Sequence, residues 1–344
     1  MRHSSIVLVA LPTLLIGAAL SAAADDGASV LDSDLRQLNV SLGGAPHYYA
    51  LTPEMGRVVL RRAPAPSEDD SDDDVLVVTD SAGRQIFKRT PRLDLPDGWD
   101  GHVLDATLRA PDRLVITAYV EAASFILAEY DLGSGELIRT VSTESIHCWD
   151  LQGDAEGTTW CLGRDASRIR DDLDYDLVYR FDASGTLLSS SLPRSAYPAS
   201  INPTGLKRCC RKGQFLPGQG EVRLWLPAAG ELIGFDEDGK VRERITLPEV
   251  EDLLKASLVT APGNEVYALL SVGPDYKDST SWTQTLVRLA PDGAAWIPVE
   301  GAPQDLSPSF MLVGADSTSL ILFDRSAMTL VWYPLPFGEA DAGS

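Results

Sequence analysis

The sequence has few of the residues that most often carry catalysis or bind anions. It contains 4 cysteines and 4 histidines among 344 residues, and only 29 lysines and arginines against 50 aspartates and glutamates, a net charge of −21. A surface this acidic repels phosphate backbones and anionic lipid head groups. We therefore expect no nucleic-acid partner, and expect cationic ligands or divalent metals to be attracted instead.

Long hydrophobic runs are lacking after the N-terminal segment, so we expect no membrane insertion there. The apolar run from Ile6 to Leu20 follows Arg2 and precedes four small residues at 21–24. This pattern is typical of a cleaved secretion signal. An uncleaved anchor is the alternative, but the two aspartates at 25–26 favour cleavage. We therefore predict a signal peptide at 1–24 and a periplasmic or extracellular mature chain.

A unit of about fifty residues is repeated along the rest of the chain. In each unit an apolar strand is followed by a short turn that ends with glycine, and a second strand follows the turn. The turn glycines follow one another at intervals of 50 to 54 residues: Gly83, Gly135, Gly185, Gly239 and Gly293. A second hairpin precedes each of these turns. Two consecutive hairpins make a four-stranded antiparallel meander, which is one blade of a β-propeller.

The repeats predict the organisation of the whole mature chain. Five complete blades are expected at 46–91, 101–142, 146–193, 200–248 and 250–300. Ser309 to Pro336 offers only three more strands, while Leu35 to Leu42 is strand-like and has no blade of its own. We predict an all-β, six-bladed propeller whose N-terminal strand closes the last blade. It forms a single domain over 25–338, with a C-terminal tail at 339–344. Closure leaves no sheet edge of the ring unpaired, and we expect a monomer.

The repeat resembles the six-bladed propeller superfamily typified by NHL-repeat proteins. Blades of that superfamily share the Phe-Asp-x-x-Gly hairpin found here at Phe181 to Gly185, together with a Gly-apolar-aromatic second strand. The resemblance covers essentially the whole mature chain and implies the fold. The superfamily includes lyases, lactonases, sugar dehydrogenases and binding scaffolds, so the fold implies no single function.

The histidines of the mature chain are placed at similar points of three consecutive blades. His47, His102 and His147 each stand nine or ten residues before the turn that enters the second strand of the blade. The same count in the fourth blade reaches Cys210, which follows Cys209. Imidazole and thiolate are ligands that zinc or copper accepts. The three histidines and Cys210 are therefore a candidate site for zinc or another divalent metal. In the alternative, the histidines only form hydrogen bonds within the channel mouth.

This set resembles the peptidyl-hydroxyglycine amidating lyases, six-bladed propellers that hold zinc with three channel histidines. The resemblance implies metal-dependent chemistry, as in a lyase or a lactonase-like hydrolase. Asp105 and Asp150 would then orient the metal ligands or act as a general base. Two features depart from that family: the histidines come from consecutive rather than spaced blades, and its catalytic arginine and tyrosine have no clear counterpart.

Four cysteines in an exported protein suggest disulfides. Cys148 and Cys161 flank a hairpin centred at 154–155, and a symmetric register would place them directly opposite each other, which permits a cross-strand disulfide. The adjacent Cys209 and Cys210 can form only a strained vicinal disulfide, remain thiols or bind metal. A bridge from Cys148 to this pair is a further alternative.

The sequence contains no Ser-His-Asp signature, phosphate-binding loop or dinucleotide fingerprint. It therefore favours a binding scaffold for an extracytoplasmic protein, peptide or glycan over an enzyme. Loops at Arg164 to Asp174 and Gly273 to Ser281 are long enough to shape a binding face. A metal-dependent lyase or hydrolase is the alternative.

Overall fold

The protein is described by a computed structural model, which divides it into two compact units, Met1–Leu35 and Arg36–Ser344. All described residues lie in the second unit. They are 36–39, 48–52, 57–62, 75–79, 85–90, 99–109, 112–120, 124–154, 156–168, 174–203, 213–216, 221–275, 278–302, 306–316, 318–324, 326–327 and 329–335. Within these ranges no helix is long and apolar enough to cross a membrane.

The strands form four-stranded antiparallel sheets, and five of these are blades made of consecutive strands. The first blade contains β2 (Tyr48–Thr52), β3 (Arg57–Arg62), β4 (Val75–Thr79) and β5 (Gln85–Arg89). The second contains β6 (Trp99–Arg109), β7 (Arg113–Val120), β8 (Ser124–Asp131) and β9 (Leu137–Ser142). The third contains β10 (Ile146–Gly153), β11 (Thr159–Asp165), β12 (Asp176–Phe181) and β13 (Leu187–Pro193).

The fourth blade contains β14 (Gln214–Phe215), β15 (Arg223–Leu226), β16 (Glu231–Phe235) and β17 (Val241–Thr246). The fifth contains β18 (Leu253–Thr260), β19 (Val266–Val272), β20 (Thr283–Leu289) and β21 (Trp296–Pro298). Short 3₁₀ helices lie in the connections, at Ala166–Arg168, Arg194–Ala196, Pro262–Asn264 and Ser279–Ser281. The predicted propeller of four-stranded antiparallel blades is confirmed.

One further sheet combines strands from the two ends of the unit. It contains β22 (Phe310–Ala315), β23 (Ser319–Asp324), β24 (Thr329–Pro334) and β1 (Arg36–Asn39), in the order β1-β24-β23-β22. β1 pairs antiparallel with β24, with Arg36 opposite Trp332 and Asn39 opposite Thr329. Below, this sheet is called the composite sheet.

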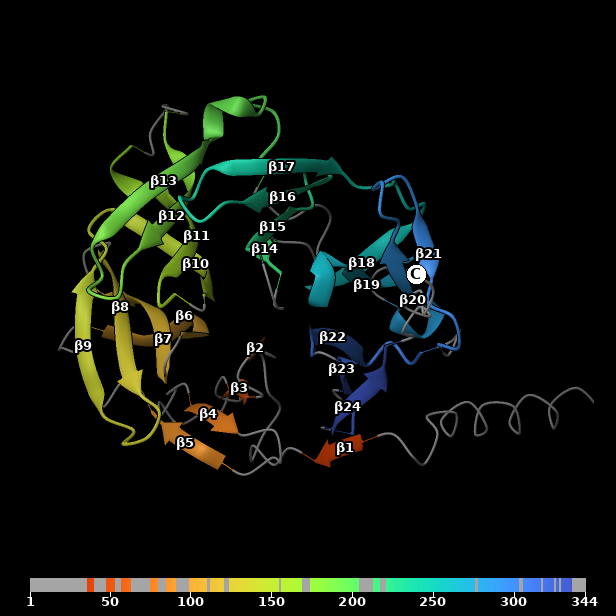
Figure 1. Cartoon of the computed structure of the whole chain (residues 1–344), viewed down its shortest axis with the longest axis horizontal. Coiled ribbons are helices and arrows are strands. Elements are labelled where there is room, and N and C mark those ends of the chain that lie inside the picture. Colours follow the sequence, from red (N-terminus) through yellow and green to blue (C-terminus); the bar gives the residue numbers. More distant parts are fainter. Residues whose placement is uncertain are drawn as a thin grey trace, which may run out of the picture. The chain divides into compact units, whose positions relative to one another are not determined.

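The first strand of each blade lies toward the common centre of the sheets (Figure 1). Most neighbouring inner strands contact each other: β2 contacts β6, β6 contacts β10, β10 contacts β14, and β22 contacts both β18 and β2. Because each blade is an up-and-down meander, all inner strands begin at the same face of the propeller. We call it the entry face. It carries the connections that lead into inner strands, such as 143–145 before β10 and 247–252 before β18.

The hydrophobic core lies between neighbouring blades. β15 is buried along its whole length, whereas the outer strand β9 alternates between half-buried and exposed residues, as expected for a strand with one covered face. Between the third and fourth blades, the rings of Trp160 and Phe235 lie 5.5 Å apart between centroids. Inter-blade packing of this kind fixes each sheet against the next.

The predicted turn glycines are confirmed at the four positions that the structure describes. Gly135, Gly185, Gly239 and Gly293 all have φ between +73° and +83°, a region that other residues resist. Gly185 is also constrained by packing, because a Cβ atom there would lie 2.6 Å from Val141 of the preceding blade. The repeated glycine therefore serves both the hairpin and the contact between blades.

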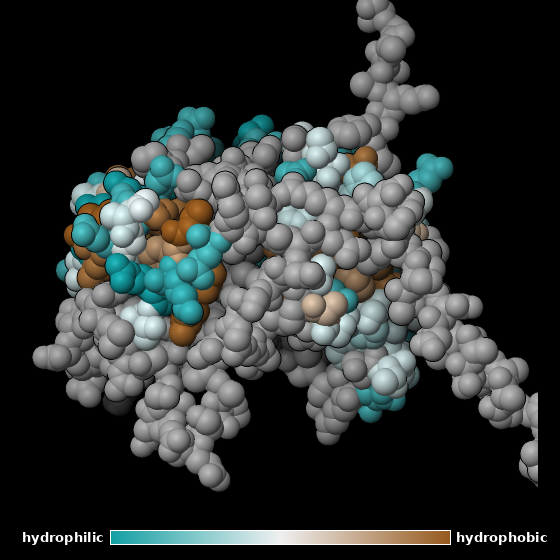
Figure 2. Space-filling view, turned by 90° about the horizontal axis from the view of Figure 1, so that it is seen from below, coloured by the Kyte–Doolittle hydropathy of each residue, from teal (hydrophilic) through white to brown (hydrophobic). Residues whose placement is uncertain are grey.

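Large hydrophobic side chains are rarely exposed among the described residues. Those at least 40% exposed belong to the outer strands β9, β13 and β21: Ile138, Leu187, Leu188 and Ile297. Figure 2 shows hydrophobic residues lying between hydrophilic ones at the side of the molecule that is on the left in Figure 1. Scattered exposure of this kind is normal at protein surfaces and marks no binding site by itself.

Candidate ligand-binding site

Two of the predicted metal ligands occupy equivalent positions of neighbouring inner strands. β6 and β10 each carry a β-bulge at their start, between Val103 and Asp105 in one and between Cys148 and Asp150 in the other. His102 and His147 each precede the bulge aspartate by three residues. The sequence register between these two blades is therefore confirmed, and both residues lie near the entry face.

The other two predicted ligands, His47 and Cys210, lie outside the described residues, as does the disulfide candidate Cys209. The strand next to His47 begins at Tyr48, which pairs with Arg61. This pairing is equivalent to that of Asp105 with Thr117. Arg61 and Thr117 each stand five residues after the turn that enters the second strand of their blade. His47 thus precedes the equivalent position by one residue, where His102 precedes it by three. The four-ligand site stays a prediction. The structure gives no group of three or more metal-ligating side chains within its described ranges.

Asp105 and Asp150 connect neighbouring blades through backbone hydrogen bonds. Oδ2 of Asp105 accepts a hydrogen bond of 2.5 Å from the backbone N–H of Leu151, one blade further on. Oδ2 of Asp150 accepts the equivalent bond of 2.5 Å from Phe215 in the next blade. Asp105 is only 1% exposed. Each carboxylate thus satisfies a backbone donor on the free edge of the following inner strand, a structural role that the sequence did not predict.

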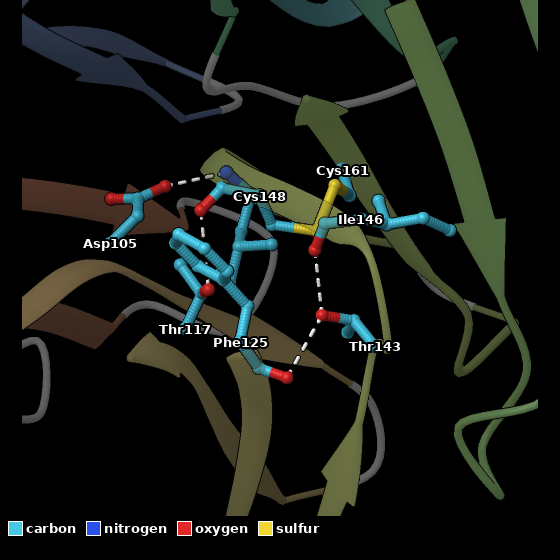
Figure 3. Close-up of a disulfide and its surroundings, with 8 residues drawn as sticks. Asp105, Thr117, Phe125, Thr143, Ile146, Cys148 and Cys161 are labelled. Atoms are coloured by element: carbon cyan, nitrogen blue, oxygen red, sulfur yellow. Dashed lines mark hydrogen bonds between the residues drawn. A yellow bond between two sulfur atoms is a disulfide. The ribbon is translucent and has the colours of Figure 1, made fainter. Parts of the chain in front are cut away.

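The ring of His147 packs against an aromatic side chain. Its centroid lies 3.7 Å from that of Phe125, with the two ring planes tilted by 34°. The hydroxyl of Thr143, in the connection into β10, lies 2.7 Å from the backbone oxygen of Ile146 and 3.1 Å from that of Phe125, and its single hydrogen is shared between these two acceptors (Figure 3). The start of β10 is thereby held against the second blade.

The predicted disulfide between Cys148 and Cys161 is confirmed. Both side chains are fully buried, and the Cα atoms lie 5.4 Å apart (Figure 3). The expected register was wrong, however: Cys148 lies opposite Gly163, and Cys161 lies opposite Leu151. The hairpin is centred on residue 156 rather than 154–155, and the β-bulge after Cys148 places this cysteine opposite a residue two positions from Cys161, so the cysteines are diagonal neighbours. A Cβ atom at Gly163 would lie 2.3 Å from the backbone oxygen of His147, so only glycine fits opposite Cys148.

A cavity of about 510 Å³ lies between the fourth and fifth blades. Its walls come from β15, β18, β19 and β21, and from the connection 247–252 at the entry face. Two tryptophans belong to the apolar part of the lining. This part consists of Trp225, Pro227, Leu247, Pro248, Val250, Leu253, Ala256, Leu258, Leu270 and Trp296. Trp225 is only 5% exposed and forms part of the wall, while Trp296 is half-buried. This volume and composition are typical of a site for a small organic molecule.

The connection 247–252, here called the rim loop, is fixed at three points. The backbone N–H of Leu247 donates to the oxygen of Gly230 at 2.9 Å, and that of Gly273 donates to the oxygen of Asp252 at 3.1 Å. Nε1 of Trp296 donates to the oxygen of Pro248 at 3.2 Å. Because the loop is held by its first two residues and by its last, the cavity is formed in advance of any ligand.

The polar part of the lining carries charge of one sign. Glu249, Glu251 and Asp252 are exposed residues of the rim loop, and the lining contains neither lysine nor arginine. Asp252 has a φ of +50°, in the left-handed region that aspartate tolerates better than most residues. Over the part of the chain that the structure describes, none of these three carboxylates has a hydrogen-bonding or ion-pairing partner.

Sequence reasoning missed this cavity. Trp225 packs in the core between the fourth and fifth blades, so a tryptophan in a strand does not by itself indicate a cavity. The available signal was the composition of the rim loop, Leu247-Pro248-Glu249-Val250-Glu251-Asp252, which combines apolar and acidic residues between an outer and an inner strand. Of the loops expected to form a binding face, 273–281 contributes Gly273, which anchors the rim loop.

A scan against protein-family models and a search of the curated proteins each found no match. Among solved structures, the chain is similar to hydrazine synthase of Kuenenia stuttgartiensis, with 9% identity, a TM-score of 0.46, and coverage of 82% of this chain and 74% of that one. For a streptogramin B lyase the identity is 11% and the TM-score 0.45, with coverage of 87% of this chain and 96% of that one. For a putative exported protein of Bacteroides fragilis the identity is 7% and the TM-score 0.45, with coverage of 78% of this chain and 76% of that one. At this level of similarity no function can be transferred.

Proposed function

We propose that this chain is an exported binding scaffold that holds a ligand with a hydrophobic body in the cavity between the fourth and fifth blades. The observation that carries the proposal is the pre-formed cavity of about 510 Å³, with two tryptophans in its lining and a rim loop anchored at three points. Export to the periplasm or the medium is supported by the signal-like segment at 1–24 and by the buried disulfide, which persists in oxidising compartments.

We further propose that the composite sheet acts as a sixth blade of the NHL-like type and closes the ring. The pairing of β1 with β24 supports this, because it joins the two ends of the unit over four residue pairs. A closed ring would hold the fourth and fifth blades at a fixed separation and so preserve the cavity between them.

The binding proposal is tested by ¹⁹F NMR of the mature protein labelled with 5-fluorotryptophan. Addition of the neutral probe 4-phenylbutan-1-ol is expected to shift the resonances of Trp225 and Trp296, which Trp225→Phe and Trp296→Phe variants assign. Trp160, which lies between the third and fourth blades, serves as the internal control.

Two filled-cavity variants, Ala256→Leu and Leu253→Phe, are expected to abolish these shifts while the Trp160 resonance stays at its wild-type position. The proposal is wrong if neither cavity tryptophan responds to the probe in the wild-type protein. It is also wrong if both filled variants respond as the wild type does.

A metal-dependent lyase or hydrolase is the second candidate, supported by the equivalent placement of His102 and His147 on neighbouring inner strands. It requires that His47 or Cys210 complete the ligand set. Metal quantification on the purified protein tests it: about one zinc or copper per chain, lost in His102→Ala, supports the site, and its absence from a zinc-supplemented preparation contradicts it.

A further inference from the structure

We propose that the cavity selects small organic cations, specifically amines with a hydrophobic body, because its apolar walls are combined with carboxylates that have no partner among the described residues. This inference rests on the proposed binding function and specifies its ligand class. The apolar lining accounts for the hydrophobic body, and the rim loop accounts for the charge.

The charges of the rim loop are the first step of the argument. Glu249, Glu251 and Asp252 all belong to the cavity lining, which carries no basic residue. The lining of another cavity is different, because it contains two arginines and most of its carboxylates have a partner; of the described carboxylates there, only the exposed Glu237 has none. At the second cavity, of about 610 Å³ between the third and fourth blades, Glu156 pairs with Arg180 and Glu221 pairs with Arg242. The cavity between the fourth and fifth blades differs in two ways: among the described residues its three carboxylates have no partner, and its lining has no basic side chain that would repel a cationic ligand.

The aromatic lining is the second step. An indole ring attracts a cation to its face and also packs against an apolar chain. Trp296 is positioned for this role because its Nε1 donates a hydrogen bond to the backbone oxygen of Pro248, which fixes the ring against the rim loop. A neutral ligand would use the tryptophans but would gain nothing from the rim loop, and an anion would be repelled by it.

The overall charge is the third step. With a net charge of −21, the chain raises the local concentration of cations at its surface and disfavours anionic ligands of any kind. The volume restricts the ligand to a small molecule, because about 510 Å³ lies within the range of small-molecule pockets.

The test uses isothermal titration calorimetry at low ionic strength with three probes of the same shape: 4-phenylbutylamine, 4-phenylbutan-1-ol and 4-phenylbutyrate. We expect the amine to bind at least about fivefold more tightly than the alcohol, and the carboxylate to bind most weakly. Raising the salt concentration to about 0.5 M should reduce the advantage of the amine, since part of it comes from exposed charges.

The triple variant Glu249→Gln, Glu251→Gln, Asp252→Asn should reduce the affinity for the amine to that for the alcohol and leave the alcohol unaffected. A matched control, Glu136→Gln, Glu144→Gln, Glu237→Gln, removes three exposed carboxylates outside this cavity and should keep the preference. Equal binding of amine and alcohol to the wild type overturns the cation preference but leaves the binding function intact. Binding of none of the three probes overturns the binding function itself.

Tighter binding of the blocked dipeptide N-acetyl-Lys-Leu-amide than of 4-phenylbutylamine would assign the cavity to a basic peptide. That result would overturn the small-molecule assignment. We expect the amine to bind more tightly, because the dipeptide has to desolvate backbone groups against a largely apolar wall.

Discussion

At the scale of single residues, a small number of polar side chains hold neighbouring blades together. Asp105, Thr107 and Asp150 all accept hydrogen bonds from backbone N–H groups of the following inner strand. Such bonds are needed because an inner strand is a sheet edge, and its buried donors have no ladder partner on that side. The two aspartates that the sequence suggested as orienting groups or a general base at a metal site thus have a structural role in joining neighbouring blades.

Removing the Asp105 carboxylate should weaken the contact between the second and third blades. We expect Asp105→Ala to lower the free energy of unfolding by about 2 kcal/mol, because a buried donor loses a charged acceptor. Asp105→Asn, which retains an acceptor oxygen, should cost less. Urea denaturation followed by tryptophan fluorescence measures both, with the exposed Glu136→Gln as control. An alanine variant as stable as the control would refute this role for Asp105.

The disulfide between Cys148 and Cys161 should contribute measurably to stability. It closes a short loop, with a sequence separation of 13, and loss of such a cross-link is expected to cost about 3 kcal/mol. Calorimetry of Cys148→Ala, Cys161→Ala against the wild type, with and without reductant, provides the measurement. If reductant lowers the melting temperature of the double variant as much as that of the wild type, another disulfide is responsible.

At the scale of elements, the sequence predicted what depends on periodicity and missed what depends on irregularity. The hairpin glycines, such as Gly185 and Gly239, predicted the blades because a glycine that recurs at a fixed interval indicates a repeated turn with positive φ. The bulges of β6 and β10 could not be predicted, since an extra residue in a strand leaves no mark in the hydrophobic alternation. The wrong register of the two cysteines has a different cause: the hairpin is centred on residue 156, as the pairing of Leu151 with Cys161 shows, and not on 154–155.

The pairing of β1 with β24 can be tested by engineered cross-linking. Leu38 and Leu330 are Cα partners, so Leu38→Cys, Leu330→Cys should form a disulfide in a background where Cys209 and Cys210 are serine. Leu38→Cys with Ile297→Cys, on the outer strand of the fifth blade, is the control and should remain reduced. Mass spectrometry of the oxidised proteins distinguishes the two. Equal cross-linking of both pairs would contradict the composite sheet.

At the scale of the whole molecule, the acidic composition is used in two ways. Many aspartates organise turns between strands, as Asp131 and Asp182 do by accepting hydrogen bonds from backbone N–H groups two to four residues on. The carboxylates of the rim loop have no such bonds and remain available to a ligand. The sequence could not separate these groups, because the difference depends on the position of each side chain in the folded structure.

The turn aspartates should make part of the stability dependent on pH. The Ser184 hydroxyl holds the pKa of Asp182 below its ordinary value of 3.8, and the backbone N–H of Ser134 does the same for the pKa of Asp131. A carboxyl whose folded pKa is lowered stabilises the fold above its unfolded pKa, and this contribution is lost as the pH falls through the folded pKa.

Asp131→Asn, Asp182→Asn should therefore be less stable than the wild type at pH 6, and the difference should disappear at about pH 2. Urea denaturation at the two pH values measures it, with Glu136→Gln, Glu237→Gln as the charge-matched control. A difference that is independent of pH would mean that the two turns are stabilised without their charge.

The central claim is that an amine with a hydrophobic body occupies the cavity between the fourth and fifth blades. The most direct measurement is a crystal structure of the mature protein with 4-(4-bromophenyl)butylamine, in which anomalous scattering locates the bromine atom. We predict a single strong bromine peak between Trp225 and Trp296, with the ammonium group toward the rim loop. Bromine peaks found only elsewhere on the protein, with the cavity empty at saturating amine, would contradict the account.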